Sequence, residues 1–185
     1  FINVIGSRDG DVSFNARTIS AYSGQTNYIS LYVDGGNLNN NNETQLNVAS
    51  SFNIIDSNVQ ASLVVKNSAS FSVGAGTTSN STAQLNFSKE NDRFLIENAR
   101  DVSFAGNLNF TNKVKNLAVT GEISDQALIR NSNFSVGKTF LFGGSEYGDV
   151  KGTDNAFLQI INDEGVNAEF NVGSLIIQAP DAGNK

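Results

Sequence analysis

The sequence predicts an all-β solenoid, and three observations support this prediction. A short pattern of alternating residues occurs three times, apolar pairs recur at regular intervals around it, and no segment sustains helical periodicity over three turns. Successive expected strands start roughly eight to nine residues apart, so three strands would form a coil of about 25 residues. We therefore expect roughly seven stacked coils.

The repeated pattern is the strongest indication of strands. Its three copies are Phe71-Ser72-Val73-Gly74, Phe134-Ser135-Val136-Gly137 and Phe170-Asn171-Val172-Gly173. Strand side chains alternate between two faces, so each Phe and Val should point inward and the residue between them outward. The closing glycine permits a turn that a residue with a Cβ would resist.

Looser relatives of the pattern predict the remaining strands in order along the chain. Asp11-Val12-Ser13-Phe14 returns as Asp101-Val102-Ser103-Phe104, and Leu128 starts one further strand. The other inward pairs are Ile29/Leu31, Leu46/Val48, Phe52/Ile54, Leu63/Val65, Leu85/Phe87, Phe94/Ile96, Leu108/Phe110, Leu117/Val119, Phe140/Phe142 and Leu175/Ile177.

Polar residues fill the spaces between these strands. Residues 37–44, 74–82 and 143–154 predict long loops, whereas most other connections are short. The chain has 27 Asn, and Asn tolerates the left-handed backbone of tight corners. Stacked Asn side chains can also hydrogen-bond into ladders along parallel strands. An AT-rich genome would enrich Asn as well, and the two interpretations are compatible.

Composition excludes several classes of function. Cys, His, Met and Trp are absent, which excludes disulfides, thiolate or imidazole metal sites and a Ser-His-Asp triad within this segment. The net charge is −6 with no basic stripe, which argues against nucleic acid binding. No apolar run is long enough to span a membrane. Because the chain starts at Phe1, we expect residues 1–185 to be a single β-helix segment excised from a longer protein.

Carboxylates are the remaining candidates for chemistry. Asp9 and Asp11, together with Glu146, Asp149 and Asp154, could serve a carbohydrate-cleaving solenoid. Such a groove needs aromatic side chains, and the only outward candidates are Tyr22, Tyr28, Tyr32 and Tyr147. We therefore expect no catalytic, cofactor-binding or metal-binding residues and a chain that is not an enzyme.

Two further motifs are interpreted as structure. Arg8-Asp9-Gly10-Asp11 resembles the opening of a calcium loop, but Val12, Phe14 and Ala16 follow where ligands are needed. This favours a turn with two solvated acids, and the acids Asp163 and Glu164 are interpreted in the same way. Five Asn-x-Ser/Thr sequons are as many as chance gives, and we interpret them as strand surface: Asn42, Asn80, Asn86, Asn109 and Asn133.

The chain resembles the passenger domains of VacA-like autotransporters, large secreted or surface proteins of Helicobacter and its relatives. The resemblance rests on Phe14-Asn15-Ala16-Arg17-Thr18-Ile19, on the Asn-rich turns, and on phrases such as Asn107–Phe110 and Leu117–Gly121. It implies a right-handed parallel β-helix that reaches the bacterial surface or medium through a C-terminal outer-membrane β-barrel outside this segment. The apolar, glycine-repeat stretch of the family's toxin has no match here, so the resemblance does not extend to toxin activity or membrane insertion.

The sequence therefore leaves three hypotheses of function. The first is a rigid scaffold and binding surface in host colonisation or adhesion, whose partner is a host cell-surface protein or glycan and whose long loops offer contact points. The second is a carbohydrate-active β-helix such as a phage tailspike or polysaccharide lyase. The third is a structural spacer without a ligand.

Overall fold

The structure is a computed structural model, and it describes residues 1–22, 28–37, 41–55, 60–75, 80–87, 93–112, 127–143 and 158–178. These ranges consist mainly of strands and contain no helix. No helix that could cross a membrane is therefore present within them. The strands are β1 (Ile2–Ile5), β2 (Val12–Tyr22), β3 (Tyr28–Asp34), β4 (Thr44–Ile55), β5 (Gln60–Lys66), β6 (Ser70–Val73), β7 (Thr82–Phe87), β8 (Arg93–Glu97), β9 (Asp101–Phe104), β10 (Asn107–Asn112), β11 (Ala127–Arg130), β12 (Phe134–Gly143), β13 (Gln159–Ile161) and β14 (Phe170–Gln178).

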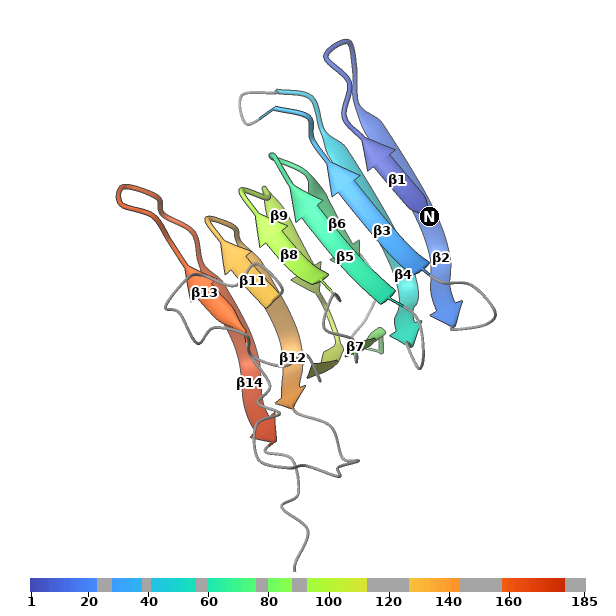
Figure 1. Cartoon of the computed structure of the whole chain (residues 1–185), viewed down its shortest axis with the longest axis vertical. Helices are drawn as coiled ribbons and strands as arrows, with labels where there is room; N and C mark the ends of the chain where they lie inside the picture. Colours follow the sequence, from blue (N-terminus) through green and yellow to red (C-terminus); the bar gives the residue numbers. More distant parts are fainter. Residues whose placement is uncertain are drawn as a thin grey trace, which may run out of the picture.

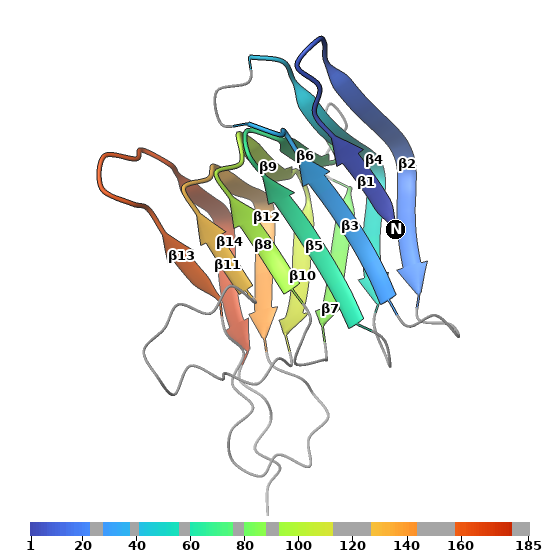
Figure 2. The same ribbon diagram turned by 45° about the horizontal axis from the view of Figure 1, so that its top comes forward.

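The described strands form two parallel sheets that run along one stack (Figures 1 and 2). One sheet has six strands in the order β1-β3-β5-β8-β11-β13. The other has eight strands, with β2 and β4 at one end and β12 and β14 at the other. The chain alternates between the sheets, so each layer pairs its backbone with the layers before and after it. The predicted all-β solenoid is confirmed.

The predicted coil size is not confirmed. Aligned partners in the six-stranded sheet lie 29 to 33 residues apart in sequence, as in Ile2 with Leu31 and Leu95 with Leu128. This period exceeds the expected 25 residues, and the described part of the sheet has six strands where seven coils were expected. The expected strand at Leu117/Val119 lies outside the described residues.

The eight-stranded sheet is bent into two faces. Strand β4 pairs with β6 through Gln45–Val48 and with β7 through Ser51–Ile55, so one long strand supports two short ones. Register shifts mark the same bend within β2 and within β12. We call residues 12–16, 44–48, 70–73, 101–104, 134–136 and 170–172 the first face, and the strand residues that follow the bend the second face. Apolar pairs that the sequence presents as separate strands thus join into one bent strand.

Phenylalanine rings fill the space between the sheets. Under the first face the ring centroids of Phe71 and Phe104 lie 5.7 Å apart, those of Phe104 and Phe134 lie 5.8 Å apart, and those of Phe134 and Phe170 lie 5.4 Å apart. These separations fall in the favourable range for aromatic pairs. Phe71, Phe104 and Phe134 are each at most 1% exposed. The stacked rings link successive layers along the solenoid, which explains why the Phe-x-Val pattern repeats.

The glycines that close the pattern serve two different purposes. Gly74 has a φ of +82°, the left-handed backbone that the sequence predicts for a turn. Gly137 has no such φ, but a Cβ there would lie 2.4 Å from the backbone oxygen of Ala105 in the layer below. Gly173 likewise would place a Cβ 2.7 Å from the oxygen of Gly137. At these two positions glycine is needed because neighbouring layers approach closely at the bend.

Asparagine occupies the corner that follows the six-stranded sheet. Asn67, Asn98 and Asn131 take positive φ values of 54°, 50° and 50° in successive layers. The Asn131 side-chain amide donates to Asn98 Oδ1 at 3.2 Å, and that of Asn67 donates to Asp34 Oδ1 at 2.9 Å. Both expectations for Asn, left-handed corners and stacked amides, are confirmed here.

Candidate binding surface

The outward side chains of the first face form two polar columns along the solenoid. Strand alternation requires this, because the apolar residues of each Phe-x-Val unit point into the core. Parallel pairing then places equivalent outward residues directly above one another. One column contains Ser13, Gln45, Ser70, Asp101, Asn133 and Glu169, and the other contains Asn15, Asn47, Ser72, Ser103, Ser135 and Asn171.

At the N-terminal end of the face these side chains bond to one another. The Asn47 side-chain amide donates to Asn15 Oδ1 at 3.0 Å, and the Ser72 hydroxyl donates to Asn47 Oδ1 at 2.7 Å. Asn15 also donates to the hydroxyl of Ser13 at 3.0 Å. This half of the face is an internally bonded ladder whose polar groups already have partners.

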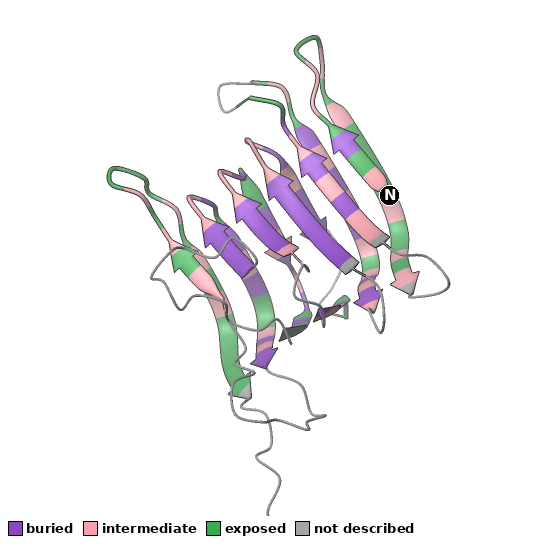
Figure 3. Cartoon of the chain, viewed as in Figure 1, coloured by how far each residue is buried: buried purple, intermediate pink, exposed green. Residues whose placement is uncertain are grey.

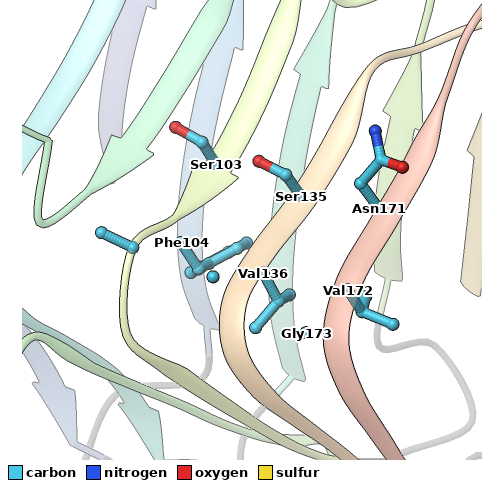
Figure 4. A pocket seen from close by; sticks show the side chains of 9 residues that line it. Ser103, Phe104, Ser135, Val136, Asn171, Val172 and Gly173 are labelled. Atoms are coloured by element: carbon cyan, nitrogen blue, oxygen red, sulfur yellow. The ribbon is translucent and has the colours of Figure 1, made fainter. Parts of the chain in front are cut away.

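At the C-terminal end the same two columns line open hollows. One hollow of about 470 Å³ is lined by Asp101, Asn133, Phe134, Ser135, Asn167, Glu169 and Asn171. The adjoining hollow of about 300 Å³ shares Ser135 and Asn171 and adds Ser103 and the glycines of the bend. Figure 4 shows the side chains of Ser103, Ser135 and Asn171 side by side above this second hollow. We call the polar residues of both hollows the polar groove.

Some groove side chains are fixed by hydrogen bonds. Asn133 Oδ1 accepts from the backbone N–H of Glu169 at 3.1 Å, and the Asn133 amide donates to the Arg100 carbonyl at 3.2 Å. The Asn171 amide donates to Glu169 Oε2 at 2.9 Å. Asn133 therefore ties the layer below to the layer above, and it sets the position of the Glu169 backbone. The amides are held in place before any ligand arrives.

Other groove side chains have polar groups available. Within the described ranges, no side-chain hydrogen bond or ion pair engages the carboxylate of Asp101 or the hydroxyls of Ser103 and Ser135. Ser103 and Ser135 are aligned in register on β9 and β12, with Asp101 at the start of β9. One carboxylate and two hydroxyls therefore face solvent from a rigid backbone, beside amides that are already oriented.

The groove is acidic. Burial raises the pKa of the Asp101 carboxyl above its ordinary value, because the surroundings disfavour its charged form. The nearby guanidinium of Arg100 lies 3.6 Å from the carboxylate of Glu43. Asp101 and Glu169 give the groove a negative character, which disfavours anionic ligands. Its carboxylates, amides and hydroxyls suit a ligand that offers several hydroxyl groups.

Among the described residues, the candidate acids Asp9 and Asp11 do not line the groove. Asp11 Oδ1 accepts from the backbone N–H of Glu43 at 2.8 Å, so it holds the turn of the next layer. Tyr32 donates its hydroxyl to Asp34 at 3.0 Å, on the six-stranded sheet. Glu146, Asp149, Asp154 and Tyr147 lie outside the described residues. In the part of the chain that the structure describes, no three acidic side chains gather as a metal site.

The interpretation of Asp163 as a solvated acid is incomplete. Its carboxylate accepts from Arg130 Nη2 at 2.8 Å and Nε at 3.2 Å, and from the Asn131 amide at 2.8 Å. These bonds from Arg130, and then from Asn131, lower the pKa of the Asp163 carboxyl. Asp163 thus joins two successive layers at the asparagine corner through its bonds with Arg130 and Asn131.

Sequence reasoning identified the outward polar positions but not the groove. The central residues of the Phe-x-Val units, Ser135 and Asn171, were predicted to point outward, and they do. Asp101 was noted only because its unit repeats that of Asp11. Their convergence with Asn167 and Glu169 depends on the layer-to-layer register, which no local pattern contains.

Comparison with known proteins gives no family for this chain. No family model matches it, and neither a curated protein nor a solved structure matches it.

Proposed function

We propose that this chain is a β-solenoid segment of a bacterial autotransporter passenger that acts as a rigid scaffold and binds a host cell-surface glycan through the polar groove. The observation that carries this proposal is the set of available polar groups of Asp101, Ser103 and Ser135 in one groove on a parallel-strand framework. Pre-oriented polar groups lower the entropic cost of binding. The resemblance of Phe14–Ile19 and of the Asn-rich turns to VacA-like passengers supports the autotransporter assignment.

The groove favours a particular class of glycan. Its two carboxylates, Asp101 and Glu169, disfavour sialylated or sulfated sugars and favour neutral or amino sugars. Binding at this surface requires neither a cofactor nor catalysis, and we propose that the segment is not an enzyme. The proposal also includes right-handed winding, since crossovers between parallel strands are almost always right-handed.

A glycan array tests the binding proposal. The test variant is Ser135→Arg, which fills the groove, and the matched control is Asn109→Arg on the second face of the neighbouring strand β10, where the residue is exposed. Loss of one or two groove hydrogen bonds should weaken binding of neutral glycans by about tenfold or more, whereas the control should bind as the unmodified chain does. Equal effects of the two variants would contradict the groove assignment. Absence of any binding to glycans or host cells would favour the spacer hypothesis.

Fractionation of the source organism tests the autotransporter assignment. An antibody raised against this chain should detect a very large outer-membrane protein that protease removes from whole cells. A detergent-resistant trimer in a phage particle would instead support the tailspike hypothesis. That result would direct attention to polysaccharide cleavage by Glu146, Asp149 and Asp154.

A further inference from the structure

The polar groove repeats the same two outward positions in successive layers of the described chain. One position holds Ser103, Ser135 and Asn171, and the other holds Asp101, Asn133 and Glu169. Figure 4 shows the first set in a row across β9, β12 and β14. Neighbouring strands lie about 4.8 Å apart, so each position recurs at that step along the axis of the solenoid.

The groove offers more positions along the axis than along its strands. In the strand direction the first face ends at the bend, which follows Val136 on β12. Two outward positions, Asn133 and Ser135, precede the bend in this layer, and they lie about 6.6 Å apart because two residues separate them. A ligand that runs along the axis meets a polar pair in each of the layers of β9, β12 and β14, and at a shorter step.

An extended chain of β-1,4-linked pyranoses fits this step. Each sugar lengthens such a chain by close to one strand spacing of about 4.8 Å. Each sugar is also turned over relative to the one before it, so the first and third sugars present the same edge to one side. The second sugar presents the opposite edge to that side. An α-1,4-linked chain coils instead and does not keep this step.

The charges of the groove alternate with the same two-layer period. In one column Asp101 and Glu169 occupy the outer layers, and Asn133 lies between them. A carboxylate accepts more than one hydrogen bond, which suits the adjacent C2 and C3 hydroxyls of a sugar. An amide both donates and accepts, which suits the opposite edge with its ring oxygen and hydroxymethyl group. The order carboxylate, amide, carboxylate therefore follows the alternating edges of a β-1,4-linked chain.

We infer that the polar groove binds a β-1,4-linked chain of neutral sugars that runs along the axis of the solenoid, with one sugar in each of the layers of β9, β12 and β14. The inference rests on the proposed function, because it takes the groove to be a glycan site. It adds the linkage of the glycan and its direction on the protein. The hydroxyls of Ser103 and Ser135 then face successive sugars from one column.

The internally bonded half of the first face bounds this site at β9. Ser72, the next residue of the column on β6, is buried, and its hydroxyl donates to Asn47 Oδ1 at 2.7 Å. The Asn47 amide in turn donates to Asn15 Oδ1 at 3.0 Å. By contrast, β12 and β14 carry exposed residues (Figure 3). A sugar over β6 would have to replace bonds that the ladder already makes, whereas a sugar over β9 would not.

Calorimetric titration of the 185-residue chain with short glucose oligomers tests the inference. Cellotriose, which is β-1,4-linked, should bind about tenfold more tightly than cellobiose, because a third layer adds one or two hydrogen bonds. Maltotriose contains the same sugars with α-1,4 linkages and should bind no more tightly than maltose. Equal affinities for cellotriose and cellobiose, or for cellotriose and maltotriose, would overturn the inference.

Variants in single layers test the direction of the chain. Ser103→Leu and Asn171→Leu each fill one outer layer, so each should lower the affinity for cellotriose to that for cellobiose and leave the affinity for cellobiose unchanged. Ser135→Leu fills the middle layer and should weaken the binding of both sugars. Asn109→Leu, at an exposed position on the second face, should change neither affinity. None of the four residues is buried, and circular dichroism checks the fold of each variant. An effect of Ser135→Leu alone would indicate a sugar that lies across the groove and would overturn the inference.

The glycan array separates this inference from the proposed function. Glycan binding that Ser135→Arg abolishes, without a gain from cellobiose to cellotriose, would overturn the axial chain and leave the proposed function in place. Absence of binding to every glycan would overturn both.

Discussion

Replacement of Phe134 by Ala should be among the most destabilising single changes in this chain. The side chain is 1% exposed, and its ring centroid lies 5.8 Å from that of Phe104, 5.4 Å from that of Phe170 and 6.0 Å from that of Phe140. It therefore contacts rings in the layer below, in the layer above and across the bend. Removing a buried Phe costs about 3–5 kcal/mol, and loss of its aromatic pairs places this site toward the upper end.

Urea unfolding followed by circular dichroism measures the effect. The control is Phe170→Ala, because that half-buried ring stacks on Phe134 but belongs to the last layer. The Phe170 ring is only partly buried, so its removal should lower the free energy of unfolding by about half as much as removal of Phe134. Phe134→Ala should lower the urea midpoint more than Phe170→Ala does, and neither should much change the dependence of the unfolding free energy on urea concentration. A loss below about 1 kcal/mol at Phe134, or equal losses at both sites, would refute the stacking argument.

Three further predictions concern the bend and the asparagine corner. Gly137→Ala should lower the free energy of unfolding by about 1–3 kcal/mol. Gly10→Ala should be nearly neutral, because a Cβ there meets nothing within 4 Å. Thermal melts of the two variants measure the difference in stability. Asn131→Ala should lower the free energy of unfolding by about 1–2 kcal/mol, because alanine disfavours the positive φ at this position. Asn131→Gly should lower it less, because glycine tolerates that backbone, and urea unfolding measures both variants. The pKa of Asp163 is lower in the folded chain than in the unfolded chain. The pair with Arg130 therefore stabilises the fold at pH values above the unfolded pKa of about 3.9. This stabilisation is lost as the pH falls through the folded pKa. The difference in melting temperature between the chain and Asp163→Asn should accordingly vanish in acid, and a difference that persists there would contradict the pairing.

Much of the fold could be predicted because it follows from local alternation. The pairs Leu63/Val65 and Phe94/Ile96 point into the core, as their two-residue spacing requires. The positive φ values of Asn67, Asn98 and Asn131 follow from a property of Asn itself. Strands and corners of this kind are set within a few residues, so a single sequence contains the information.

The period of the solenoid could not be predicted in the same way. A spacing of eight to nine residues per strand predicts coils of about 25 residues, but aligned partners in the six-stranded sheet lie 29 to 33 residues apart. Loops between strands can lengthen without disturbing the stack, because closing a longer loop costs little free energy. Strand spacing therefore does not fix coil length.

The sequence by itself determined that this protein is a stack of short strands with a phenylalanine core and polar outward residues on the first face. Only the tertiary structure decided which polar residues meet, and whether they bond to one another, as Asn15 and Asn47 do, or leave groups available, as Ser103 and Ser135 do. It also decided that Gly137 serves the close approach of two layers rather than a left-handed turn. The physical reason is that alternation is a property of one strand, whereas the groove and the bend are properties of the register between strands about thirty residues apart.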